Sequence, residues 1–226
     1  MAEGRQDPVF SERPTARVIG DAWAFAAPLA VLGALLAWLG APWPGAALGA
    51  LALFCVAFFR NPARRFAGGA RDVVAPADGR VLAVDEIEDG RGAKGLRIGI
   101  FLSVFDVHVN RAPVAGRVVS IERGGTRFLA AFDPRGEHEN VRLAMALETD
   151  AGERVVVTQI TGLVARRIVC HPRAGEWLAR GTRYGLIRFG SRTDVLLPPG
   201  SSPCVRRGER VRGGATRIAQ LPEPRA

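Results

Sequence analysis

The bond between Gly190 and Ser191 lies between two β-prone runs late in the chain. The serine hydroxyl can attack the carbonyl of Gly190 to form an ester. Loss of the serine α-proton then breaks the chain and leaves dehydroalanine, which hydrolyses to a pyruvoyl group. Glycine suits the position before the attack because it tolerates a strained backbone. The site therefore predicts a self-made ketone cofactor, with an ordinary Gly-Ser turn as the alternative.

A second candidate for chemistry is His108, within residues 105–111 (FDVHVNR). If this segment is extended, Asp106, His108 and Asn110 share one face. Histidine is the side chain best matched to proton transfer near neutral pH, and its two polar neighbours could orient it. A surface histidine at a strand end is the alternative.

Decarboxylation of an α-amino acid leaves a carbanion beside nitrogen, so it needs an electron sink conjugated to that nitrogen. Pyridoxal phosphate requires a lysine, and Lys94 is the only lysine in the chain. No Gly-rich loop opens a helix to cradle its phosphate. A pyruvoyl carbonyl at residue 191 would do the same work by taking the substrate amine as an imine. The lysine shortage and the Gly-Ser bond favour the same cofactor.

A charged loop, residues 131–140 (AFDPRGEHEN), contains the run from Glu137 to Glu139 with His138 between them. Adjacent residues in a loop seldom converge on one ion, and no second pair of His or Cys residues has ligand spacing. We therefore predict no metal site. The loop is either a solvated connection or a flap over a site.

The pattern near the N-terminus, at residues 22–59, predicts a membrane anchor. Residues 1–21 form a polar arm, whereas residues 22–59 contain no charged side chain and are interrupted at 40–45 (GAPWPG). A bilayer core takes about 20 helical residues, so residues 22–39 fit one span and 43–59 a short second. Arginines on both flanks would place both ends on the cytoplasmic side; they are Arg17, Arg60, Arg64 and Arg65. A re-entrant hairpin and a buried hairpin of a soluble protein are the alternatives.

Residues 60–226 read as a β-rich domain with an internal repeat. Residues 75–84 (APADGRVLAV) recur as 112–121 (APVAGRVVSI), and a looser relative occupies 205–214 (VRRGERVRGG). Each copy is a Pro-entered turn leading into a strand. The pattern resembles the hammerhead turns of biotinyl and lipoyl carrier domains. We expect a β-rich (α+β) fold, a flattened barrel or sandwich of short strands behind the apolar helical hairpin, with a short helical turn at 175–181.

The hammerhead pattern also raises a rival function, a swinging-arm carrier or a membrane-anchored binding domain. A carrier needs its modified lysine in an exposed hairpin turn. Lys94 lies in a Gly-rich loop but lacks the Met or Asp neighbours that such turns carry,.

Composition bounds the partners and the compartment. The formal charge is +9, almost wholly from arginine, which favours an anionic partner. No nucleic-acid-binding module is recognisable and the apolar hairpin does not suit one, so we expect an anionic lipid surface and no nucleic acid. Three cysteines form no even disulfide framework, which indicates a reducing, cytoplasm-facing location; they are Cys55, Cys170 and Cys204.

Three segments together resemble the short form of phosphatidylserine decarboxylase. They are residues 76–79 (PADG), 105–113 (FDVHVNRAP) and 188–195 (RFGSRTDV), in one order from about residue 60 onward. The resemblance implies a pyruvoyl-dependent carboxy-lyase of phospholipid biosynthesis, which converts phosphatidylserine to phosphatidylethanolamine at the cytoplasmic face of the cell membrane. It also implies cleavage after Gly190 into a β chain (1–190) and an α chain (191–226) that remain together as a heterodimer.

The resemblance assigns roles residue by residue. Ser191 would become the pyruvoyl group that forms a Schiff base with substrate. Asp78 would support self-cleavage, and His108 would protonate the carbanion. The second histidine of the family's His-x-x-His pair falls on Arg111, which is a poor base. The proton acceptor for self-cleavage is therefore open among His108, His138 and Asp78.

Overall fold

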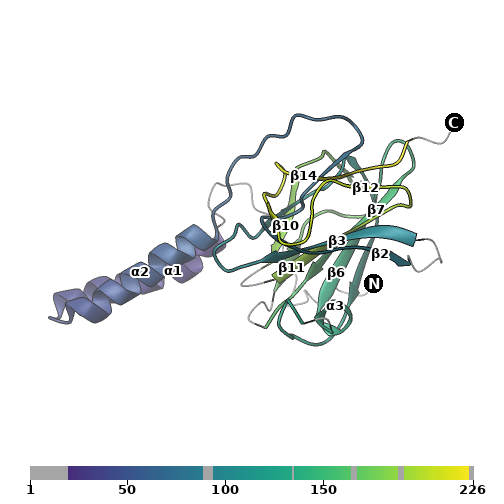
Figure 1. Ribbon diagram of the computed structural model, residues 1–226. Helices are drawn as coiled ribbons and strands as arrows, with labels where there is room; N and C mark the ends of the chain where they lie inside the picture. Colours follow the sequence, from purple (N-terminus) through teal and green to yellow (C-terminus); the bar gives the residue numbers. More distant parts are fainter. Residues whose placement is uncertain (1–19, 89–93, 134, 164–166, 188–190, 224–226) are drawn as a thin grey trace, which may run out of the picture. The chain divides into compact units, whose positions relative to one another are not determined.

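The computed structural model describes residues 20–88, 94–133, 135–163, 167–187 and 191–223. These residues divide into two compact units, a helical unit that ends at Ala63 and a β-rich unit that begins at Arg64. Figure 1 shows the helices and strands and labels many of them. Most of the expected polar arm, residues 1–19, lies outside the described residues.

The helical unit is a pair of helices, α1 (Asp21–Trp38) and α2 (Pro42–Phe58). Gly40, at a φ of 86°, follows α1, and Pro42 opens α2. Both residues suit these places, since glycine tolerates a left-handed backbone and proline fits the first helical turn. The expected apolar helical hairpin is confirmed.

The outer surface of this pair is strongly apolar. Trp38 is 80% exposed, Trp43 85% and Leu53 72%. Such contiguous exposed apolar surface is unusual on a soluble protein and indicates an interaction surface. The expectation of two spans is not supported, because none of the described helices is long and apolar enough to cross a bilayer.

The β-rich unit contains fourteen strands and one short helix among its described residues. They are β1 (Asp72–Val74), β2 (Gly79–Glu88), β3 (Lys94–Leu102), β4 (Val109–Arg111), β5 (Gly116–Gly124), α3 (Gly136–Glu139), β6 (Arg142–Glu148), β7 (Arg154–Ile160), β8 (Ile168–Cys170), β9 (Trp177–Leu178), β10 (Arg183–Ile187), β11 (Ser191–Leu197), β12 (Ser202–Pro203), β13 (Arg210–Val211) and β14 (Arg217–Gln220).

One large sheet carries most of the core. Its order is β13-β2-β3-β11-β7-β6-β5-β9, and two three-stranded sheets have the orders β1-β14-β12 and β4-β10-β8. Alternate residues of β3 are fully buried, namely Ile98, Ile100 and Leu102. They join one cluster with apolar side chains of β11, β7 and β6, as expected when one face of a sheet is covered. The β-rich fold is confirmed.

The internal repeat appears as two crossed turns. Val74 N–H donates to the carbonyl of Pro113 at 2.9 Å, and Arg111 N–H donates to the carbonyl of Pro76 at 2.8 Å. Each Pro-entered turn thus binds the residues that lead into the other. Strand β2 begins at the glycine that ends the first turn, and strand β5 begins at the glycine that ends the second.

Each copy also pairs with its own distant turn. Val81 exchanges backbone hydrogen bonds with residues 208 and 209, at 2.8 and 2.9 Å. Val118, the equivalent residue of the second copy, does the same with residues 175 and 176, at 2.7 and 2.8 Å. The expected looser relative at 205–214 is therefore the partner of the first copy, and residues 175–182 (GEWLARGT) are its counterpart.

This pairing corrects the prediction of a helical turn at 175–181. The segment contains strand β9, which pairs with β5, and Gly175 has a φ of 90°. The hydrogen bonds to Val118 hold the segment extended instead.

The glycine that ends each turn is required by close packing. A Cβ at Gly79 would lie 2.1 Å from the carbonyl oxygen of Phe101, and one at Gly116 would lie 2.5 Å from that of Glu148. Both distances are far shorter than a van der Waals contact. Neither strand can therefore begin with a residue that has a Cβ atom.

We predict that Gly116→Ala destabilises the protein by about 1–3 kcal/mol, the usual cost of forcing extra atoms into a packed site. The thermal unfolding midpoint in detergent should fall by about 2–4 °C for each kcal/mol. Gly69→Ala is the matched control, because its Cβ would meet nothing closer than the Asp72 carboxylate at 3.9 Å. Equal midpoints for the two variants would contradict the packing argument.

Candidate functional site

The register of three adjacent strands brings two of the predicted residues to one end of the large sheet. Arg80 of β2 pairs with Phe101 of β3, and Phe101 pairs with Arg192 of β11. Asp78 lies two residues before Arg80, and Ser191 lies one residue before Arg192. Neighbouring strands lie about 4.8 Å apart, so only β3 separates the two backbones.

Ser191 is the first residue of β11 and pairs with Leu102. It is 0% exposed, and its Oγ has no hydrogen-bond partner among the described residues. A buried hydroxyl without a partner is costly and calls for a reason, of which reactivity is one. Gly190, on the other side of the predicted scissile bond, lies outside the described residues.

His108 lies beside the strand that leads to Ser191. Its side chain is 2% exposed, and its backbone carbonyl accepts a hydrogen bond from the N–H of Ile187 at 3.3 Å. Ile187 ends β10. Residues 103–108 therefore connect Leu102, the partner of Ser191, to His108, the partner of Ile187.

The ring of His108 is oriented by a backbone carbonyl. Its Nδ1 lies 3.0 Å from the carbonyl oxygen of Asp106. Because a carbonyl only accepts, Nδ1 carries a proton, and in the neutral ring Nε2 is the nitrogen that can accept one. A proton-transfer group needs such a fixed tautomer.

The expected common face of Asp106, His108 and Asn110 is only partly formed. Strand β4 begins at Val109, and the Asp106 carboxylate instead accepts from Ser103, at 2.9 Å from N and 2.7 Å from Oγ. The carboxylate closes a turn, which alternation along a strand cannot predict.

A buried polar chain lies next to Ser191. Asn110 Nδ2 donates to Oγ1 of Thr193 at 3.2 Å, and Gln159 Nε2 donates to Oδ1 of Asn110 at 2.8 Å. All three residues are 0% exposed. Thr193 shares a face of β11 with Ser191, so this chain fixes that face against β4. In the sequence, only the polar side chain of Asn110 indicated this chain of hydrogen bonds.

Asp78 lies in the turn before β2. Its carboxylate accepts from Arg64 Nη2 and from the N–H of Gly213, each at 2.7 Å. Arg64, expected as a membrane-surface charge, is thus held within the β-rich unit, with a side chain only 17% exposed. These two hydrogen bonds fix the orientation of the carboxylate.

Arg111 lies close to Asp78 but cannot act as a base. It is 5% exposed and donates to the carbonyl of Gly181 at 3.2 Å. Burial, followed by repulsion from Arg183 and Arg64, lowers the pKa of Arg111 to about 10, while Asp78 acts in the opposite direction. The guanidinium therefore stays protonated at neutral pH.

His138 lies on the side of β11 away from Ser191. It lines a cavity of about 170 Å³ with Arg97, Glu137 and Asp194. Asp194 alternates with Ser191 along the strand, so the two side chains point to opposite faces. This placement argues against His138 as the acceptor for self-cleavage.

A cluster of ion pairs covers this second face. Arg192 binds Asp194 at 2.6 and 2.8 Å and reaches Glu137 at 3.1 Å. Arg97 pairs with Glu137 and, at 2.5 Å, with Asp85. Burial raises the pKa of Asp194, although Arg192 acts against the rise. The cluster links two parts of the chain. One is the loop that contains α3, and the other is β11, the strand that begins at Ser191.

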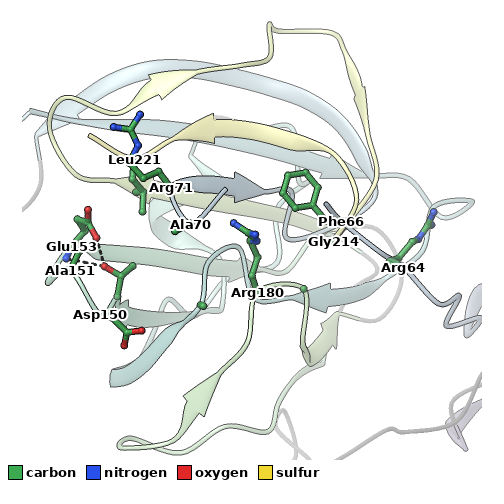
Figure 2. A pocket seen from close by; sticks show the side chains of 13 residues that line it. Arg64, Phe66, Ala70, Arg71, Asp150, Ala151, Glu153, Arg180, Gly214 and Leu221 are labelled. Atoms are coloured by element: carbon green, nitrogen blue, oxygen red, sulfur yellow. Dashed lines mark hydrogen bonds between the residues drawn. The ribbon is translucent and has the colours of Figure 1, made fainter. Parts of the chain in front are cut away.

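The cavity of Figure 2, of about 520 Å³, reaches from Arg64, the partner of Asp78, to the connection between β6 and β7. The figure shows Asp150 and Glu153 at one side, Arg180 between, and Arg64 at the other side. Residues 149–153 connect the ends of β6 and β7 that lie away from Ser191. Arg180 is held by the carbonyls of Gly69 and Asp72, at 2.5 and 2.9 Å, so it braces the fold.

Other reactive groups do not compete with Ser191 in the described part of the chain. The cysteines are free thiols, and burial raises the pKa of Cys170 to about 12, so it stays protonated,. No three His, Cys, Asp or Glu side chains among the described residues gather as a metal site requires.

Comparisons with known proteins identify the family of the chain. The family model described as phosphatidylserine decarboxylase matches residues 51–219. A phosphatidylserine decarboxylase proenzyme of Symbiobacterium thermophilum is 48% identical over 206 residues, which cover 90% of this chain and 95% of the relative. Proteins of the same name are 49% identical over 172 residues in Pelobacter propionicus, covering 76% and 78%, and 44% identical over 207 residues in Burkholderia pseudomallei, covering 90% and 94%. The chain belongs to the phosphatidylserine decarboxylase family.

Proposed function

We propose that the chain decarboxylates phosphatidylserine to phosphatidylethanolamine with a pyruvoyl group that it makes from Ser191, after cleaving its own Gly190–Ser191 bond. The observation that carries the proposal is the buried Oγ of Ser191, which has no hydrogen-bond partner among the described residues. The relatives that are named proenzymes support a processing step.

Strand β11 can keep its place in the sheet after the Gly190–Ser191 bond is cleaved. Residues 192–196 pair with β7 on one side and with β3 on the other. These ladders, with the Arg192–Glu137 ion pair, would hold the new N-terminal end of the α chain in place without the covalent bond. The α and β chains would therefore remain together.

A pyruvoyl group at this position supplies a carbonyl that withdraws the electron pair left when carbon dioxide departs. The residues around it exclude water, because Ser191, Thr193 and Asn110 are each 0% exposed. Exclusion of water strengthens electrostatic interactions in the site.

His108 is proposed to deliver the proton to the carbanion. Its Nδ1–H is held by the Asp106 carbonyl, so Nε2 is the atom that exchanges the proton. Since Arg111 stays protonated and His138 lies on the opposite face of β11, the acceptor for self-cleavage is either His108 or Asp78.

The helical pair is proposed to attach the enzyme to the membrane. Its exposed side chains include Trp38, Trp43, Leu53 and Val31, which fit the boundary between head groups and acyl chains. The β-rich unit would then act on lipid in the same membrane, at its cytoplasmic face.

Replacing the serine separates this enzyme from a carrier or a binding domain. Ser191→Ala should run as one uncleaved chain of 24.1 kDa without a ketone or decarboxylation, because no hydroxyl attacks Gly190. Ser202→Ala, in the exposed strand β12, is the matched control and should cleave like wild type. Intact mass measured under denaturing conditions checks both.

Borohydride added to wild-type protein with phosphatidylserine should attach lipid to the small chain. A wild-type chain that stays whole and active, or lipid attached to Lys94, would overturn the pyruvoyl mechanism.

The second test concerns proton delivery. His108→Ala should leave the chain cleaved but reduce kcat by about 10²–10⁴-fold, the usual contribution of a positioned acid or base. His138→Ala should keep both cleavage and turnover. An uncleaved His108→Ala chain would make His108 the self-cleavage base, and full activity would refute its role.

The third test concerns the helical pair. Removing residues 1–59 should move the protein from the membrane to the soluble fraction of a lysate. High salt should not release the full chain, because burial of apolar surface outweighs surface charge. Fractionation and immunoblotting measure both, and an unchanged membrane fraction after the deletion would exclude the anchor.

A further inference from the structure

Three large apolar side chains are exposed on the loops at the Ser191 end of the large sheet. Phe105 is 73% exposed, Phe132 70% and Leu163 66%. They follow β3, precede β6 and follow β7, and these are the strand ends in register with Ser191 and Arg192. We call these three side chains the loop rim.

The structure holds Phe132 of the loop rim outward rather than leaving it loose. The ring packs edge-on against Phe101 with centroids 6.4 Å apart, and Phe101 is the strand partner of Arg192. Behind it, Asn140 is 0% exposed and binds N and O of Leu129 at 2.7 and 2.9 Å and the carbonyl of Thr161 at 2.8 Å. One buried amide therefore fixes the connections that carry Phe132 and Leu163.

Phe105 is fixed by the turn that orients His108. The Asp106 carboxylate accepts two hydrogen bonds from Ser103, and the Asp106 carbonyl orients the histidine ring. The exposed ring thus lies three residues from the proposed proton donor. A surface that binds Phe105 therefore lies near His108.

Exposed cations accompany the loop rim. Arg210, with a side chain 74% exposed, lies 3.7 Å from Asp106, next to Phe105. Arg135 and Arg127, 67% and 64% exposed, lie on the connection that carries Phe132, where they form exposed ion pairs with Asp133 at 2.9 Å and Glu139 at 3.3 Å. Apolar rings among arginines fit a bilayer surface with anionic head groups, where rings enter the interface and guanidinium groups meet phosphate.

We propose that the loop rim is the surface by which the β-rich unit docks on an anionic bilayer and takes up its lipid substrate. The inference rests on the proposed function, and it adds a contact separate from the helical pair. That pair keeps the chain on the membrane, whereas the loop rim presents the Ser191 end of the large sheet to the head groups. A bilayer is favoured over a protein partner because the substrate head group must reach a buried Ser191.

The test uses the full chain with Phe105 and Phe132 both changed to Ser. Decarboxylation is measured on vesicles of phosphatidylserine and phosphatidylcholine, and on short-chain phosphatidylserine below its critical micelle concentration. We expect kcat/KM on vesicles to fall at least about tenfold, since each lost ring removes apolar burial at the interface. Turnover of the monomeric lipid should change less than about twofold, because the groups that act on the head group are intact.

Trp177→Ser is the matched control. Trp177 is 50% exposed but pairs with Arg117, at the end of β5 that lies away from Ser191. It should leave both activities unchanged. Unaltered vesicle activity in the double variant, or an equal loss on both substrates, would overturn the docking surface. A wild-type protein that is uncleaved or inactive on the monomeric lipid would instead defeat the proposed function, so the two failures are distinguishable.

Discussion

Strand β11 lies between β3 and β7 in the middle of the large sheet, and the arrangement of the site depends on this double pairing. The pairing sets Ser191 level with Leu102 and turns its hydroxyl toward the buried face. The opposite face, which carries Arg192 and Asp194, is tied by ion pairs to Glu137. A strand that is hydrogen-bonded on both sides has little freedom to move. Cleavage at one defined bond, before Ser191, requires such a fixed strand.

Local patterns predicted much of this architecture. The uncharged run broken by Pro and Gly predicted the helical pair, and the repeated Pro-to-Gly turns predicted the short-strand fold. What they missed was pairing between distant segments. Residues 175–181 were predicted to form a helical turn, although residues 175–182 (GEWLARGT) resemble residues 208–216 (GERVRGGAT). Their similarity becomes visible once Val81 and Val118 are seen to bind equivalent turns.

The site was predicted in part for the same reason. Motif resemblance selected Asp78, His108 and Ser191, and their segments do converge. The contacts that position them come from elsewhere in the chain: Arg64 and Gly213 for Asp78, and a backbone carbonyl for His108. Such partners obey no fixed spacing. The departure at Arg111 was visible in the sequence. Burial among other arginines lowers the pKa of Arg111 to about 10, and this value is still high enough for the charge to be retained at neutral pH.

The two crossed turns are alike in backbone but not in chemistry. Asp78 of the first copy binds the backbone of its partner turn at Gly213, whereas the equivalent position in the second copy is Ala115. The second turn has the backbone of the first without its carboxylate. The second turn is then free to vary in side chain as long as its glycine remains, while the first is constrained twice, by packing and by charge.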